Sequence, residues 1–150
     1  MCDLEIIIMN IRAIIYATIV AVNLGYTSSA IAEDMDLLPE AKTQNGVTYL
    51  SGGFGLAEVT AMKAAANGYA LMLICAIQDT GKYLADIKLS ITDSSGTAVL
   101  DTVIDGPILL AQLPPGQYRI NADSDGKTVN RTVQIRANHP VKLNLYWPER

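Results

Sequence analysis

The chain has 150 residues, half of them hydrophobic, and a formal net charge of −4 at pH 7. This length accommodates a single domain of ordinary size. Because acidic side chains outnumber basic ones by fifteen to eleven, the chain lacks the positive charge that neutralises phosphates, and nucleic acid is not expected as a partner.

The N-terminal region has the composition of a secretory signal peptide. Residues 9–36 read MNIRAIIYATIVAVNLGYTSSAIAEDMD, in which Arg12 supplies positive charge and residues 13–24 form a short apolar run. That run has about a dozen residues, whereas a helix that spans a bilayer needs about 20. We therefore expect no stable membrane insertion once the signal has been removed.

The end of this region predicts where the signal is cleaved. Ala30 and Ala32 place small residues at the two positions that signal peptidase reads. Cleavage is therefore expected before Glu33, and residues 1–32 are predicted to form the signal peptide. The mature protein is expected to be periplasmic or secreted, in a bacterial cell envelope.

The first eight residues do not fit the signal pattern. Asp3 and Glu5 are acidic where the start of a signal peptide is basic. We hypothesise that translation begins at Met9, which would leave residues 1–8 outside the natural precursor.

Only one cysteine belongs to the predicted mature chain. Cys2 lies ahead of the cleavage site, and Cys75 lies in the apolar stretch YALMLICAIQ. A single cysteine cannot form an internal disulfide in an exported protein. Since its neighbours are apolar, Cys75 is predicted to be a buried free thiol, with a reactive or intermolecular thiol as the alternative.

The mature chain begins with a polar segment and a helix. Residues 33–46, EDMDLLPEAKTQNG, show no periodicity and are predicted to be a flexible leader. Residues 47–68 are predicted to form a short strand, a glycine turn and a helix that ends at Asn67-Gly68. Residues 69–77 are apolar at nearly every position, which predicts a strand covered on both faces, with this helix as the nearest lid.

The rest of the chain alternates between apolar and polar residues with a period of two. Turn signals separate the alternating segments about every eight to twelve residues, which is typical of an antiparallel β-sandwich. Residues 69–150 are therefore predicted to form a seven-stranded antiparallel sandwich, and the predicted fold class is mainly β with one short α-helix before it. The strand candidates after the apolar one lie at residues 87–92, 97–104, 108–113, 118–122, 129–135 and 141–147.

Part of this region resembles a known family. The segments ADIKLSITDSSG (residues 85–96) and LPPGQYRINA (residues 113–122) resemble the carboxypeptidase regulatory-like domain. The resemblance implies a transthyretin-like, seven-stranded Greek-key sandwich over about residues 69–147. It also implies a non-catalytic accessory module, because such domains accompany many different exported proteins. The matching positions are Leu113, Pro115, Gly116, Tyr118, Ala122 and Gly126.

The residues that enzymes most often use are scarce. His139, in RANHPVKL, is the single histidine of the sequence, and no cysteine lies near it. A metal site normally needs three or four ligands, and a Ser-His-Asp triad would have to use this histidine without a G-x-S-x-G motif. We therefore predict no catalytic residue, no metal site and no cofactor. An enzyme that gathers acidic side chains around His139 is the alternative.

The stretch Asp123-Ser124-Asp125-Gly126 resembles the start of a calcium loop but does not fit one. An EF-hand loop has glycine at its sixth position and glutamate at its twelfth. Here glycine is fourth, and the twelfth residue is Gln134. The stretch is predicted to be a hairpin turn. A different calcium site that recruits Asp93 or Asp105 stays open.

Four aromatic residues are candidates for a binding surface: Tyr49, Phe54, Tyr83 and Tyr146. If they were exposed together, they would form a patch suited to a sugar or a protein. Trp147 falls on the apolar face of the last predicted strand and is expected in the core.

These observations favour a binding module. We expect an exported, non-catalytic β-sandwich that recognises a protein or a glycan in the cell envelope, or adds a strand to a partner's sheet edge. The alternatives are a structural envelope protein that acts by oligomerisation and an enzyme with a site near His139.

Overall fold

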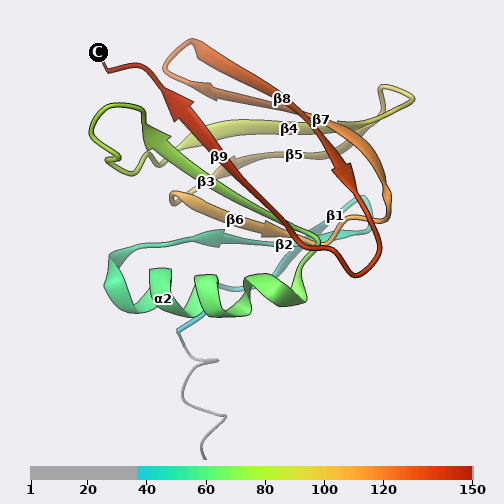
Figure 1. Cartoon of the computed structure of the whole chain (residues 1–150), viewed down its shortest axis with the longest axis horizontal. Helices are drawn as coiled ribbons and strands as arrows, with labels where there is room; N and C mark the ends of the chain where they lie inside the picture. The colour runs from blue at the N-terminus through green and yellow to red at the C-terminus, as the bar shows by residue number, and fades with distance from the viewer. Residues whose placement is uncertain (1–36, 150) are drawn as a thin grey trace, which may run out of the picture. The chain divides into compact units, whose positions relative to one another are not determined.

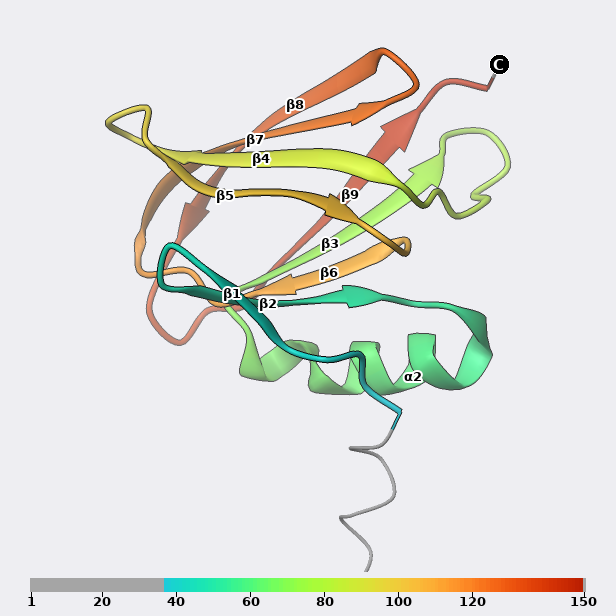
Figure 2. The same ribbon diagram turned by 180° about the vertical axis from the view of Figure 1, so that it is seen from behind.

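The computed structural model describes residues 37–149, and Figure 1 and Figure 2 show them from opposite sides. These residues form nine strands in two sheets, one α-helix and a short 3₁₀ turn. The described protein is therefore mainly β with one short α-helix, as the sequence predicts. The predicted signal peptide, its cleavage site and the start at Met9 lie outside the described residues.

The strands divide into a five-stranded and a four-stranded sheet. The five-stranded sheet has the order β1 (Lys42–Gln44), β2 (Val47–Gly52), β6 (Ile108–Ala111), β3 (Leu71–Ile77) and β9 (Val141–Trp147). The four-stranded sheet has the order β5 (Ala98–Ile104), β4 (Ile87–Asp93), β7 (Gly116–Ser124) and β8 (Lys127–Ile135).

The two sheets lie face to face and enclose the main hydrophobic core (Figure 1). Alternate residues of the strands point into this core because successive side chains of a strand point to opposite faces. Leu73 and Leu109 come from the five-stranded sheet, and Leu89 and Ile120 come from the four-stranded one. Trp147 is buried in the same core, which confirms its predicted place.

The helix covers the other face of the five-stranded sheet (Figure 2). α2 (Gly55–Ala65) is followed by the 3₁₀ turn Ala66–Gly68, so the chain leaves the helix close to the predicted Asn67-Gly68 stop. This second layer explains why residues 69–77 do not alternate, since β3 is covered on both faces. The second cluster comprises Val59, Met62 and Ala66 against Leu50, Met72, Ile108 and Leu110.

One strand pair differs from the predicted antiparallel arrangement. β3 and β9 are parallel over their whole length, from Leu71 opposite Val141 to Ile77 opposite Trp147. Strands joined by a hairpin must be antiparallel, but β3 and β9 are far apart in the sequence and no tight turn fixes their direction. The sandwich also differs from the predicted seven strands: β3 to β9 make seven, but β1 and β2 pair into the five-stranded sheet and bring the number to nine.

The predicted leader differs from the structure in its last part. Residues 42–44 form β1, which pairs with β2 through the turn Asn45-Gly46. Both turn residues have positive φ, +49° and +81°, as a two-residue hairpin turn requires. An Asn-Gly pair between two short segments is the signal for such a hairpin, and it lies in the segment that the sequence pattern assigned to the leader.

Candidate functional site

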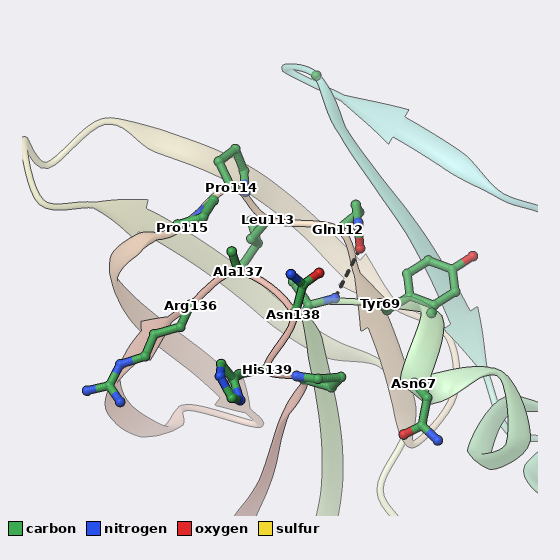
Figure 3. Close-up of a pocket in the computed structure, with 14 residues that line it drawn as sticks. Asn67, Tyr69, Gln112, Leu113, Pro114, Pro115, Arg136, Ala137, Asn138 and His139 are labelled. Carbon is green, nitrogen blue, oxygen red and sulfur yellow. Dashed lines mark hydrogen bonds between the residues drawn. The ribbon is translucent and has the colours of Figure 1, made fainter.

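A cavity of about 690 Å³ opens at one end of the sandwich, where four loops meet (Figure 3). The β1–β2 turn contributes Gly46, and residues 67–70 come from the end of the helix. Residues 112–115 belong to the β6–β7 loop, and residues 136–140 belong to the β8–β9 loop. Side chains from the end of a scaffold therefore converge on one hollow, the usual place for binding residues on a rigid β framework.

The β8–β9 loop brings Arg136 and His139 of the lining together. Arg136 and His139 pair across an isolated antiparallel bridge, and the His139 amide donates to the Arg136 carbonyl oxygen at 3.3 Å. Asn138 between them has a φ of +58°, which asparagine tolerates better than most residues. Both residues line the cavity, and Figure 3 shows the Arg136 side chain extending away from Gln112 and Asn67.

Amide side chains line the part of the cavity nearest the helix. The Oε1 atom of Gln112 accepts a hydrogen bond from the Ala70 amide at 3.0 Å, drawn as a dashed line in Figure 3. This bond ties the β6–β7 loop to the segment that follows the helix. Asn67 and Asn138 are exposed in the lining, and their carboxamides can both donate and accept hydrogen bonds.

The charge of this lining has a single sign. Arg136 is permanently cationic, and no aspartate or glutamate is among the residues that line the cavity. The electrostatics therefore suit an anionic group or a neutral, hydroxyl-rich one. The alternative of an enzyme near His139 requires acidic side chains around it, and this lining does not supply them. Within residues 37–149, no group of three histidine, cysteine or acidic side chains could hold a metal ion.

The four predicted aromatic residues do not form one patch. Tyr49 is buried, and its hydroxyl lies 3.2 Å from the Thr102 hydroxyl, so it does not contribute to an exposed patch. The reason is that Tyr49 shares the inward face of β2 with Val47. Phe54 is exposed at the N-cap of α2.

Tyr83 and Tyr146 are the two aromatic candidates that the fold brings together. Both pair with Ala76 of β3, one through an isolated bridge and the other through the β3–β9 ladder. Their side chains are 43% and 41% exposed on the face of the sheet that the helix partly covers. Lys63 of the helix approaches this pair, with its Nζ atom 3.3 Å from the Tyr83 hydroxyl.

The aspartates proposed for a calcium site are already engaged within the fold. Asp125 and Gly126 have φ values of +52° and +81° and join β7 to β8, which confirms the predicted hairpin turn. The Asp123 carboxylate accepts hydrogen bonds from the Gly126 amide at 3.2 Å and the Thr128 hydroxyl at 3.0 Å. Asp93 accepts from the Ser95 and Thr97 amides, and Asp105 pairs with Lys42 at 3.2 Å.

Cys75 is a fully buried free thiol in β3, as predicted. Burial raises the pKa of its thiol from the ordinary 9.0 to about 12. A thiol that remains protonated at neutral pH is a poor nucleophile.

No protein-family model matches the chain, and no curated protein shows significant similarity to it. In the described part of the chain, no helix is long and apolar enough to cross a membrane.

Among the residues that line the cavity, His139 is the one that the sequence analysis considers for chemistry. Asn67, Gln112 and Arg136 lie in three separate loops and match no motif. Pro114 and Pro115, in the segment that carries the family resemblance, also line the cavity. The distribution of charge distinguishes the segment that contains Arg136. The whole chain is acidic, whereas residues 127–148 contain four basic residues and no acidic one, namely Lys127, Arg131, Arg136 and Lys142.

Proposed function

We propose that this protein is an exported recognition module that binds an acidic saccharide in the cavity at the loop end of its sandwich. The proposal takes the chain to be a transthyretin-like domain of the carboxypeptidase regulatory-like class, working in the cell envelope. The arrangement of two sheets face to face is compatible with this class, with β1 and β2 as two strands beyond the seven that the resemblance implies. So is Tyr118, which is buried beside the LPPG turn and donates its hydroxyl proton to the Pro114 carbonyl oxygen at 2.9 Å.

The observation that carries the proposal is the composition of the cavity lining. Vicinal hydroxyls of a sugar each donate and accept hydrogen bonds, and carboxamides such as those of Asn67 and Asn138 can do both in return. Arg136 offers a planar fork of donors that fits a carboxylate, and His139 stands next to it in the turn. A uronic acid residue combines both kinds of group.

The size of the cavity agrees with this ligand class. A volume of about 690 Å³ falls within the range of roughly 300–1,000 Å³ that is usual for small-ligand sites. Because the lining comes from loops of a rigid sandwich, its residues can recognise a ligand without a large change of the fold. The proposed role is binding, which requires no catalytic residue in the lining.

Titration calorimetry with residues 33–150 and trigalacturonate tests the proposal. We expect binding, with the neutral trisaccharide maltotriose at least tenfold weaker. Arg136→Gln removes the guanidinium and should weaken trigalacturonate binding about 10- to 100-fold, the value of a charge-assisted hydrogen bond of about 1.5–3 kcal/mol. Arg119→Gln is the matched control, because Arg119 is also exposed but lies on β7, outside this cavity.

Two results would count against the proposed ligand. Equal affinity for the acidic and the neutral sugar would remove the role of Arg136. Binding of a peptide with a free C-terminal carboxylate, but not of trigalacturonate, would reassign the cavity to polypeptide ends. Export is tested separately, by cell fractionation and by the mass of the mature chain, which should begin at Glu33.

A further inference from the structure

β9 is an edge strand whose outer backbone groups are available for pairing. It is the last strand of the five-stranded sheet, with β3 on its inner side. The Val141 amide donates to the Ala70 carbonyl oxygen, and the Trp147 carbonyl oxygen accepts from the Gln78 amide, so odd-numbered residues direct their backbone groups toward β3. Because these directions alternate along a strand, Lys142, Asn144 and Tyr146 direct theirs to the free edge.

The opposite side of the sandwich is closed by side chains of the first hairpin. Gln44 Oε1 accepts from the Asp101 amide at 2.6 Å, and Asn45 Nδ2 donates to the Ala98 carbonyl oxygen at 3.4 Å. The Ser51 hydroxyl accepts a hydrogen bond of 2.9 Å from the amide of Asp105, the residue that follows β5. Two backbone groups of β5 and the amide that follows the strand are therefore occupied by side chains, and β1 beside it is only three residues long.

β8 is the remaining edge strand, and one of its own side chains protects it against the addition of another strand. Arg131 lies opposite Ile120 and so belongs to the inward face of the strand, yet its side chain is exposed. Its Nη1 atom donates to the Asn130 carbonyl oxygen at 2.9 Å. An inward-directed charge that also occupies an edge carbonyl discourages strand addition. No described side chain makes a hydrogen bond of this kind to the backbone of Lys142, Asn144 or Tyr146.

The segment that forms β8 and β9 is rich in basic residues. Residues 127–148, which comprise both strands and their connection, carry four arginine or lysine residues and no acidic one. Trp147 links the two strands, because its Nε1 atom donates to the Lys127 carbonyl oxygen at 2.7 Å. Lys142 therefore lies on β9 itself and Lys127 lies beside its last residue, where Asp125 lines the same hollow as Lys127 and Trp147.

We propose that the free edge of β9 binds an extended acidic polypeptide segment of a partner protein, which adds to the five-stranded sheet as a sixth strand. Main-chain hydrogen bonds to Lys142, Asn144 and Tyr146 supply the pairing. Charge complementarity selects a partner strand with acidic side chains, since Lys142 lies in the strand itself and Lys127 lies beside it. This surface is separate from the loop-end cavity, and the inference goes beyond the proposed function.

A pair of synthetic peptides tests the inference on residues 33–150. The probe is the acidic strand former EVEVEVEVE, and its control is EPEVEPEVE, which has the same charge but two prolines that remove backbone donors. We expect EVEVEVEVE to bind and to slow hydrogen exchange at the amides of residues 142, 144 and 146. Equal binding of the two peptides would overturn strand addition and leave only electrostatic attraction. Binding of KVKVKVKVK as tightly as EVEVEVEVE would overturn the acidic preference.

Matched variants locate the edge. Asn144→Pro removes an outward amide and spares the ladder to β3, so the protein should fold and lose at least tenfold in EVEVEVEVE affinity. Asn130→Pro makes the same change at an outward position of β8 and should leave affinity within twofold. Lys142→Glu changes an exposed side chain and introduces no proline, so it tests the same edge without a risk to folding. It should weaken the binding of EVEVEVEVE about three- to tenfold. Full affinity in Lys142→Glu, or exchange protection at β8 in place of β9, would overturn the assignment.

Discussion

The indole Nε1 of Trp147 donates a 2.7 Å hydrogen bond to the main-chain carbonyl oxygen of Lys127. Trp147 ends the edge strand of one sheet, and Lys127 begins the edge strand of the other. The bond therefore joins the two sheets at the end of the sandwich opposite the β8–β9 loop. Trp147 is 2% exposed, so it also contributes a large apolar surface to the main core.

Replacing Trp147 with phenylalanine should destabilise the protein by about 2–4 kcal/mol. The smaller ring leaves a void in the core, and the Lys127 carbonyl loses its partner. Urea unfolding of the two proteins measures the difference. Tyr146→Phe is the control, since the Tyr146 side chain is exposed, and it should stay within about 0.5 kcal/mol of the parent.

Gly106→Ala should destabilise the protein by about 1–3 kcal/mol, because a methyl group there would overlap the carbonyl oxygen of Gly52. The turn between β5 and β6 and the end of β2 would have to move apart. Gly68→Ala serves for comparison, as a methyl group at Gly68 meets open space and its φ is not positive. Thermal unfolding should separate the two variants, and an unchanged melting temperature for Gly106→Ala would contradict the close approach.

The stability of the protein should fall at high pH partly because of Cys75. Its pKa is 9.0 in an ordinary environment and about 12 when buried in the native state. Below pH 9 the thiol is protonated in both states and the stabilisation is complete. Between pH 9 and 12 the unfolded chain releases the proton while the native chain keeps it, which costs up to about 1.4 kcal/mol per pH unit.

The Cys75→Ala variant isolates the contribution of the thiol to the pH dependence of the unfolding free energy. Cys75→Ala carries the same lysines and tyrosines, so subtracting its unfolding free energy from that of the parent at each pH leaves the thiol effect. A difference that does not change from pH 8 to pH 11 would show that the thiol ionises equally in both states. The native thiol should also resist alkylation at neutral pH, in contrast to the denatured chain.

Calcium should not stabilise the protein. Both carboxylate oxygens of Asp123 are engaged by the hairpin turn that follows, and the Asp105 carboxylate is paired with Lys42. Millimolar calcium chloride should leave the melting temperature unchanged, with magnesium chloride at the same ionic strength as the reference. A rise that is specific to calcium would show that these aspartates leave their present partners.

Much of the strand content followed from local patterns in the sequence. The alternation of Ile87, Leu89 and Ile91 places three side chains on one face, and the structure buries all three. Asp125-Gly126 predicted a hairpin turn because glycine adopts positive φ without cost. Such features depend on residues within a few positions of each other, so they can be inferred without knowledge of the fold.

Tyr49 shows where local patterns were insufficient. The sequence makes it a candidate for an exposed patch, but β2 pairs with β6 and its inward face closes the core against the four-stranded sheet. That arrangement depends on β6, which lies about 60 residues further along the chain. The exposure of a side chain on a strand is decided by its partners, and these are remote in sequence.

The sequence by itself determined the mainly β class, the covered apolar strand, the helix beside it and the positions of most turns, because burial periodicity and turn chemistry are local properties. Only the tertiary structure decided the parallel pairing of β3 with β9, the side-chain contacts along the edge of β5 and the position of β9 at the other edge of its sheet. It also decided the loop-end cavity, which joins Asn67, Gln112 and Arg136 from loops that are distant in sequence. Pairing and convergence of this kind are set by how the chain folds back on itself, which a pattern along the chain does not encode.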